Sequence, residues 1–325
     1  MAVNVETQIG KLKLKNPVLV ASGTFGYAKE FEKLIDLQKL GGIVTKTLTL
    51  KPRLGNPPQR IVETPSGMLN AIGLQNVGVA KFIDDKLPFL AQLNIPIIAS
   101  VMGHSVEEFV GCIRALDHCD AVDGFELNLS CPNVSYGRVP GGSDPSGTLV
   151  GQRGQTPLAP MFAHDAAMIE EATRAVRRVT DKTLIAKLGP DVSDIGSMAA
   201  AAERAGADAV SLINTFVAMA IDVKTRKPVL ANKTGGLSGP CVRPIAVRMV
   251  WEVCQKVKIP VVGIGGIMNA QDALEFLIAG AAAIQVGTAN FMNPCASLEI
   301  LEGLKDFMKK EKIRDLKEII GSIQT

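Results

Sequence analysis

A chain of 325 residues in which 47% of side chains are hydrophobic is long enough to bury a large core. Its 35 basic and 32 acidic residues nearly cancel, and with only 4% aromatic residues this composition argues against a nucleic-acid-binding protein. No apolar run approaches the roughly 18 residues that a membrane helix needs, and residues 1–6 lack the basic and apolar regions of an export signal. We therefore expect a cytoplasmic protein that contacts neither nucleic acid nor membrane.

The cysteines support the same compartment. There are six, at positions 112, 119, 131, 241, 254 and 295, and none forms a Cys-x-x-Cys pair. Such scattered cysteines are typical of reduced thiols in a cytosolic protein. We expect neither a zinc site nor an iron–sulfur cluster on this chain.

Apolar, β-rich runs recur along the chain with helical patterns between them. Their nearly continuous hydrophobicity is typical of parallel strands that are covered on both faces, and eight of them is the number that a closed barrel needs. We therefore predict an α/β fold, a single (β/α)8 TIM-barrel domain over residues 1–325. The predicted strands are Pro17–Ala21, Gly42–Thr47, Pro96–Val101, Gly124–Leu129, Thr183–Leu188, Ala209–Asn214, Pro260–Ile264 and Ala282–Val286, and the main predicted helices are Val106–Leu116, Ala166–Val179, Ile195–Ala205, Pro244–Val257, Ala270–Ala279 and Leu298–Lys309.

Two long segments do not fit a minimal barrel. Leu50–Leu74 and Tyr136–Pro160 are rich in glycine and proline and show little periodicity, so both are predicted as loops. Each follows the carboxyl end of a predicted strand, where barrel enzymes place substrate loops. We expect the first to line the site and the second, a loop insertion at 136–160, to act as a lid or an insertion beside it.

A cysteine stands at the end of the fourth predicted strand. Phe125, Leu127 and Leu129 alternate with polar residues, and Pro132 cannot continue the ladder, so Cys131 falls at the carboxyl end of this strand. None of the three histidines has such a position. A thiol is therefore the candidate base for proton transfer, whereas the alternative interpretation of a lone strand-end cysteine is a small buried hydrophobic residue.

Glycines mark the ends of the seventh and eighth predicted strands. Gly263–Gly266 and Gly287 would let backbone N–H groups approach a phosphate there. Lys233–Gly239 is predicted as a third glycine-rich loop before a helix. No Gly-x-Gly-x-x-Gly follows the first strand, which argues against a dinucleotide-binding fold.

Polar residues at other strand ends indicate an anionic, planar ligand. Lys46 and Lys187 interrupt apolar strand runs, where a lysine is costly unless an anion or a ring system accepts it. Amide side chains suited to a heterocycle stand at Asn70, Asn128, Asn133 and Asn214.

Four motifs together resemble dihydroorotate dehydrogenase. They are Asn128–Asn133, Asn70–Asn76, Asn232–Gly239 and Gly287–Asn290, and they span nearly the whole chain. The opening segment, residues 16–26, is similar to the class whose catalytic subunit passes electrons to NAD⁺. The resemblance implies an FMN-containing barrel that oxidises dihydroorotate to orotate in pyrimidine biosynthesis. It also implies a partner subunit that carries FAD and a [2Fe–2S] cluster, in a heterotetramer of two catalytic and two electron-transfer subunits.

The resemblance also assigns roles to residues. Cys131 would remove the proton from C5 of dihydroorotate while hydride leaves C6 for N5 of the flavin, and Lys46 would lie between flavin and substrate. The residues implied for FMN are Ser22, Lys46, Thr47, Ser100, Asn128, Lys187, Ile213, Gly239, Gly265, Gly266, Gly287 and Thr288, and those implied for dihydroorotate are Lys46, Asn70, Ala71, Ile72, Gly73, Leu74, Asn128, Asn133, Asn214 and Thr215.

The chain departs from the family pattern at two places. Ser100 stands where the family usually has an asparagine that contacts the flavin, and the loop at 136–160 is longer than the family pattern. In the membrane-attached class, serine stands in place of Cys131 and an N-terminal extension is present, so from the resemblance we do not expect this chain to belong to that class.

Three other interpretations remain. One is the homodimeric dihydroorotate dehydrogenase that uses fumarate, which matches less well at Ser22–Gly26. Another is a flavoprotein similar to dihydropyrimidine dehydrogenase, which activity on uracil and on dihydroorotate would distinguish. The non-enzyme alternative is a flavin-binding scaffold subunit, which an intact Cys131 and Lys46 argue against.

Overall fold

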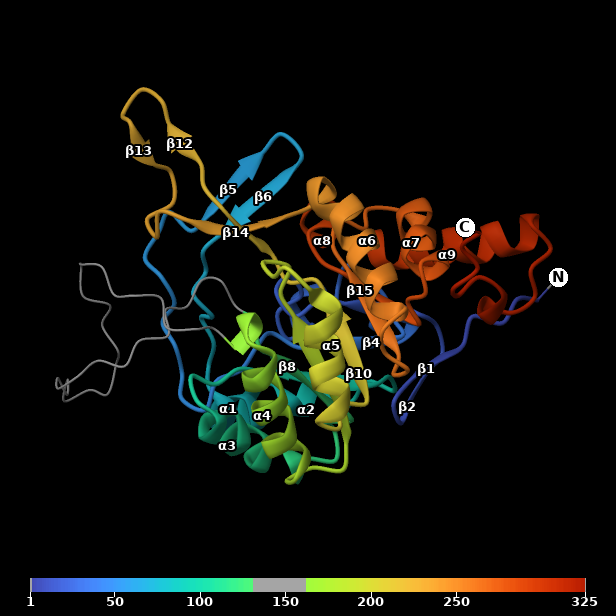
Figure 1. Ribbon diagram of the computed structural model, residues 1–325, viewed down its shortest axis with the longest axis horizontal. Helices are drawn as coiled ribbons and strands as arrows, with labels where there is room; N and C mark the ends of the chain where they lie inside the picture. The colour runs from blue at the N-terminus through green and yellow to red at the C-terminus, as the bar shows by residue number, and fades with distance from the viewer. Residues whose placement is uncertain (1, 131–161, 325) are drawn as a thin grey trace.

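The computed structural model describes residues 2–130 and 162–324, and a closed barrel of eight parallel strands forms its centre (Figure 1). Neighbouring strands in the barrel follow one another along the chain, and the last pairs with the first. This confirms the predicted (β/α)8 architecture. Cys131 and the predicted insertion at 136–160 lie outside the described residues. The barrel strands are β3 (Val18–Val20), β4 (Gly42–Val44), β7 (Ile97–Val101), β8 (Gly124–Asn128), β9 (Thr183–Leu188), β10 (Ala209–Leu212), β15 (Val261–Ile264) and β16 (Ala283–Val286).

Two barrel strands end two or more residues before their predicted carboxyl ends. β4 ends at Val44 and β10 at Leu212, so Lys46 and Asn214 stand in the loops that follow. After β4 the backbone turns away from the barrel ladder, because the Lys46 N–H donates to the carbonyl of Gly26 at 2.8 Å. The apolar runs therefore located the strands, and hydrogen bonds to another loop set the end of β4.

Helices cover the outside of the barrel. The six main helices begin and end within a few residues of the predicted bounds, and α3, α4, α5 and α7 begin after Ser, Asp or Asn side chains that accept first-turn N–H groups. Within the described ranges, no helix has the length and apolar character needed to cross a membrane. The helices are α1 (Val79–Asp85), α2 (Leu87–Leu90), α3 (Val106–Asp117), α4 (Ala166–Arg177), α5 (Ile195–Arg204), α6 (Arg243–Cys254), α7 (Ala270–Ile278), α8 (Ala289–Met292) and α9 (Ala296–Lys310), with 3-10 turns at Lys29–Phe31, Leu37–Lys39, Phe162–His164, Pro240–Val242 and Leu316–Glu318.

An antiparallel hairpin closes the amino-terminal end of the barrel. It consists of β1 (Thr7–Ile9) and β2 (Leu12–Leu14), in which apolar residues alternate with exposed ones. Ile9, Leu12 and Leu14 form one buried cluster with inward residues of the barrel strands, among them Leu19, Val44, Ile98, Ile185 and Val262. This end is therefore an apolar plug.

A second sheet stands at the opposite end (Figure 1). Its strands run in the order β11 (Phe216–Ala218), β14 (Gly235–Ser238), β6 (Gly67–Asn70) and β5 (Ile61–Thr64), and all pairs are antiparallel. A further hairpin, β12 (Ile221–Asp222) with β13 (Lys227–Pro228), projects beyond it. The segments 50–74 and 233–239 were predicted as loops, and that prediction is wrong where they form these strands.

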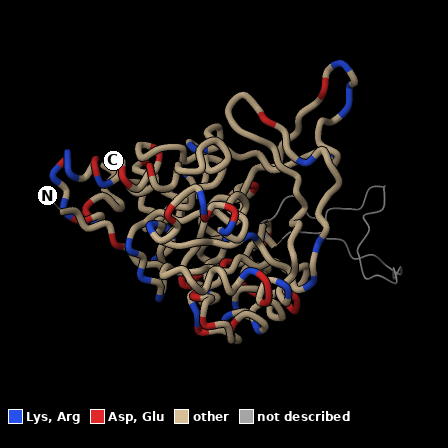
Figure 2. The backbone as a smooth tube through the Cα atoms, turned by 180° about the vertical axis from the view of Figure 1, so that it is seen from behind, with Lys and Arg blue, Asp and Glu red and all other residues tan. Residues whose placement is uncertain are grey.

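Charged side chains are distributed over the outer surface. Figure 2 shows lysine and arginine interleaved with aspartate and glutamate along the outer helices and loops. The formal net charge is only +3.

Candidate active site

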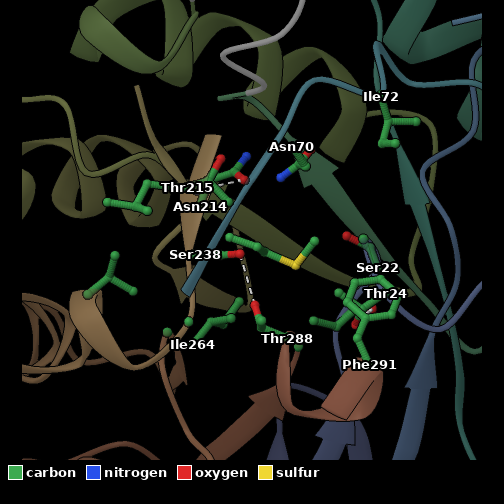
Figure 3. Close-up of a pocket in the computed structure, with 18 of the residues that line it drawn as sticks. Ser22, Thr24, Asn70, Ile72, Asn214, Thr215, Ser238, Ile264, Thr288 and Phe291 are labelled. Atoms are coloured by element: carbon green, nitrogen blue, oxygen red, sulfur yellow. Dashed lines mark hydrogen bonds between the residues drawn. The ribbon is translucent and has the colours of Figure 1, made fainter. Parts of the chain in front are cut away.

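A cavity of about 410 Å³ opens between the carboxyl ends of the barrel strands and the antiparallel sheet (Figure 3). Strand-end loops supply its floor, and β6, β14 and residues 72–75 supply its cover. Residues of the segment 50–74 thus line this cavity, where the sequence predicted a site. The predicted site residues that line this cavity are Ser22, Lys46, Thr47, Asn70, Ile72, Gly73, Leu74, Asn128, Lys187, Ile213, Asn214, Thr215, Gly239, Gly265, Gly266, Gly287 and Thr288.

Four predicted residues are not among them. Ala71 is fully buried in a small cluster with Leu69 and Leu230, because alternation along the chain turns it away while Asn70 and Ile72 face the cavity. Ser100 is fully buried behind Thr47, with their hydroxyl oxygens 2.9 Å apart, and it is too short to reach the cavity wall. Neither residue lines the cavity in this structure, and their ligand contacts stay predictions. Cys131 and Asn133 lie outside the described residues.

Strand β8 explains how the barrel presents polar groups inward. All five of its residues are buried. Alternate side chains therefore point to two different buried regions, and neither face of the strand is exposed to solvent. Phe125 and Leu127 pack in the outer core. Glu126 and Asn128 point into the barrel, where they bond to Ser211 and Thr47. The strand therefore delivers Asn128 directly to the cavity floor.

Amide side chains form a connected network on this floor. Asn128 Nδ2 donates to Thr47 Oγ1 at 3.3 Å, and Asn214 Nδ2 donates to Asn128 Oδ1 at 3.1 Å. Asn214 also donates to the carbonyl of Ser130 at 2.9 Å. Its own Oδ1 accepts from the Thr215 backbone (Figure 3). Two strand ends and the loop before Cys131 are thus held by one set of hydrogen bonds. Such a network keeps donors and acceptors at fixed positions for a planar ring.

The ionisable groups that line the cavity are all cationic within the described part of the chain. They are Lys46, Arg60 and Lys187, and no aspartate or glutamate joins them. Burial lowers the pKa of Lys46, the Arg60 guanidinium lowers it further, and Glu30 acts in the opposite direction. Clustered cations in a partly buried cavity repel one another, so an anionic ligand would relieve that repulsion.

Glycines bring the backbone close to the cavity at the seventh and eighth barrel strands. Gly266 has φ +73°, and a Cβ there would lie 2.8 Å from the carbonyl oxygen of Gly239. Gly287 is different, since a Cβ there would meet nothing nearer than Ala21 Cβ at 3.6 Å. Beside it, Thr288 Oγ1 donates to Ser238 Oγ at 2.9 Å (Figure 3). This wall can accommodate a phosphate, which in barrels sits at the same two strand ends.

Sequence reasoning missed several residues of the cavity. Met68, Leu237 and Ser238 come from the antiparallel sheet, whose strands had been predicted as loops, and Arg60 directly precedes its strand β5. Phe291, half-exposed at the rim, lies in the short helix α8 just after the glycines of the eighth strand. An arginine inside a segment expected to line an anion site was a usable signal for Arg60. The strand pairing that positions it gave no local signal.

The comparisons with known proteins agree with this geometry. A sequence model of the family described as dihydroorotate dehydrogenase matches residues 4–148 and 154–308. Similar curated proteins include one from Trichlorobacter lovleyi, 52% identical over 320 residues that cover 98% of each chain, and one from Thermodesulfovibrio yellowstonii, 51% identical over 98% of this chain and 99% of its own. A third, from Pelobacter propionicus, is 49% identical over the full length of both chains.

All three relatives carry the name dihydroorotate dehydrogenase B (NAD(+)), catalytic subunit. The match covers both the barrel strands and the segments of the antiparallel sheet, so it includes every described element of the cavity. The chain belongs to the dihydroorotate dehydrogenase family.

Proposed function

We propose that this chain is the catalytic subunit of a cytoplasmic, NAD⁺-linked dihydroorotate dehydrogenase, which oxidises dihydroorotate to orotate with FMN as hydride acceptor in pyrimidine biosynthesis. The observation that carries the proposal is the cavity itself. It combines three cations, a bonded set of asparagines and a glycine wall at the carboxyl end of the barrel. An anionic pyrimidine and a phosphorylated flavin are the ligands that this combination suits.

The residues present fit FMN. A cavity of about 410 Å³ is within the range of small-molecule sites. Gly265, Gly266, Gly287 and Thr288 would hold the phosphate, while Thr47, Asn128 and Lys187 would contact the ring. When bound there, FMN supplies the electron-accepting ring that takes up the hydride from the substrate.

The chain's own groups would bind dihydroorotate and move its proton. Asn70, Asn128, Asn214 and Thr215 would hold the pyrimidine edge, and Lys46 would stabilise the negative charge. Cys131, as thiolate, would take the proton from C5 while the hydrogen on C6 leaves with its electron pair, so that the C5–C6 double bond of orotate forms. The Cys131 thiol would then lose this proton to solvent. Ser130, its neighbour in the chain, is fixed by Asn214, which supports a defined strand end at this point.

Electrons must leave the chain after each turnover. We propose an electron-transfer subunit carrying FAD and a [2Fe–2S] cluster, in an assembly of two catalytic and two electron-transfer subunits. The names of the relatives, which pair "catalytic subunit" with NAD(+), support this proposal. Co-purification with such a subunit and dihydroorotate-dependent reduction of NAD⁺ would test it, whereas turnover with fumarate alone would favour the homodimeric class.

Substrate choice tests the activity directly. The purified FMN-loaded protein is supplied with an artificial electron acceptor and with either dihydroorotate or dihydrouracil, which lacks the carboxylate. Because the ionisable lining is cationic, we expect turnover with dihydroorotate and little with dihydrouracil. The reverse preference would identify a flavoprotein similar to dihydropyrimidine dehydrogenase.

A further inference from the structure

A layer of buried polar side chains lies inside the barrel beneath the cavity. It comprises Glu126, Lys187, Ser211 and Gln285, which come from β8, β9, β10 and β16 and are each at most 5% exposed. Each of the last three stands two residues beyond a member of the apolar layer below: Ile185, Ala209 and Ala283. Residues two apart on a strand share a face, so the barrel interior changes from apolar to polar within one step toward the cavity.

The carboxylate of Glu126 is held at the centre of this layer. Its Oε2 accepts from Gln285 Nε2 at 2.8 Å and from Ser211 Oγ at 3.0 Å. Its Oε1 faces Lys187 Nζ at 3.7 Å, and among the described residues Lys187 is the cation with which it pairs. Two neutral donors on one oxygen thus fix the carboxylate. Among the described residues the other oxygen has no hydrogen-bond partner, and its contact with the ammonium is an ion pair.

Lys187 connects this layer to the cavity. Its side chain lines the cavity, where Nζ also lies 3.4 Å from Ser22 Oγ, whereas Glu126 does not reach the cavity wall. We propose that Glu126 is a positioning residue that acts through Lys187, holding the ammonium in place so that it donates to the flavin ring. This inference rests on the proposed function.

Stability alone does not account for the buried acid. A buried ion pair is often replaceable by apolar residues without loss of stability, and the layer below shows that this barrel fills its interior with aliphatic side chains. Lys46 offers a contrast, because no carboxylate of the described residues forms an ion pair with it. The two lysines therefore differ: Lys46 forms no ion pair among the described residues, and Lys187 is a donor whose direction Glu126 fixes.

A double-mutant cycle on flavin affinity tests the proposal. The dissociation constant for FMN is measured by fluorescence with full-length apoprotein for wild type, Glu126→Gln, Lys187→Met and the double variant. We expect Glu126→Gln to weaken binding about tenfold or more, within the range of coupling between residues that share an ion pair. In the Lys187→Met background the same change should have no further effect.

Two outcomes overturn the inference. One is wild-type affinity in Glu126→Gln, and the other is an equal loss of affinity in the presence and in the absence of Lys187, which indicates a merely structural role. Failure of the wild-type protein to bind FMN would instead contradict the proposed function.

A second variant keeps the test usable if Glu126→Gln does not fold. Ser211→Ala removes one of the two donors to Glu126 and leaves the carboxylate in the barrel. It should weaken FMN binding by a smaller factor, again only when Lys187 is present. Loss of affinity in both backgrounds would overturn the inference in this case as well. Thermal unfolding of each apoprotein serves as the folding control.

Discussion

The two ends of the barrel are built from the same eight strands and differ in the polarity and charge of their side chains. The amino-terminal end is closed by Ile9, Leu12 and Leu14 against aliphatic barrel residues. The carboxyl end holds three cations, a bonded set of asparagines and a glycine wall beneath a second sheet. The difference shows that one end of the strands stabilises the fold and the other is left for ligands, a division that holds across barrel enzymes. Each prediction below changes one end and leaves the other intact.

The largest effect is expected from Cys131→Ala. Loss of a general base lowers a rate by about 10²–10⁴-fold, so orotate formation should fall by that factor while FMN affinity stays at the wild-type value. Steady-state turnover with an artificial acceptor measures the first, and fluorescence titration measures the second.

Cys119→Ser is the matched control. Cys119 follows α3, near the opposite end of the barrel. Its replacement by serine should therefore leave turnover unchanged. Turnover within a few fold of wild type in Cys131→Ala would remove Cys131 from the mechanism.

Leu14→Ala should lower the stability of the fold and leave the ligand-binding end of the barrel unchanged. Leu14 is 1% exposed in the plug, and truncation of such a leucine to alanine typically lowers the free energy of unfolding by about 2–5 kcal/mol. Urea unfolding measures this loss, and the FMN dissociation constant of the folded protein should not change. Lys13→Ala, at the exposed position before it, should alter the free energy of unfolding by less than about 0.5 kcal/mol. A large loss of flavin affinity in Leu14→Ala would show that the two ends are not independent.

Gly287→Ala changes the phosphate wall without straining the backbone. The added methyl group would meet Ala21 Cβ at 3.6 Å, which is ordinary contact, so the free energy of unfolding should stay within about 0.5 kcal/mol of wild type. If FMN lies against this wall, one extra methyl group should weaken its binding by about tenfold or more. Unchanged affinity would place the phosphate elsewhere.

The smallest effect concerns the pH dependence of stability. Because burial lowers the pKa of Lys46 in the folded apoprotein, the unfolded chain binds more protons between this lowered pKa and the ordinary value of 10.5. The free energy of unfolding contributed by Lys46 therefore rises as pH increases through that window.

Lys46→Met removes this contribution. The difference in unfolding free energy between wild type and Lys46→Met should shift in favour of wild type from neutral toward alkaline pH. Lys13→Met, which changes an exposed lysine at the other end, controls for the loss of one positive charge. If the difference in unfolding free energy between wild type and Lys46→Met does not change with pH, the lowered pKa of Lys46 would be contradicted.

The sequence predicted the barrel well because each barrel strand has a recognisable pattern in its own short stretch of sequence. Parallel strands covered on both faces appear as short apolar runs, and all eight runs became strands. The antiparallel sheet gave no such signal. Its central pairing joins Asn70 to Gly236, far apart in the chain, through short strands rich in glycine and polar residues. No local pattern could therefore separate these strands from loops.

The residues of the candidate site also fall into those that a local pattern predicted and those that depend on pairing between distant segments. Strand-end residues such as Asn128 and Gly266 were found because the fold places strand ends together. Lys187 was predicted to need an anionic or ring-shaped partner, and the structure supplies one from the protein itself, Glu126, on the neighbouring strand. The side chains of Ala71 and Ser100 do not line the cavity, because the direction of a side chain depends on register and loop packing, which the sequence alone does not fix. Arg60 was missed because its position depends on the antiparallel sheet.

The most direct test of the ligand-binding end is anaerobic mixing of the FMN-loaded wild-type protein with dihydroorotate, followed by the flavin absorbance. The proposed chemistry predicts rapid bleaching as the hydride from C6 reaches the flavin, together with formation of orotate. A flavin that stays oxidised in the presence of saturating dihydroorotate would contradict the assignment of this cavity to dihydroorotate oxidation.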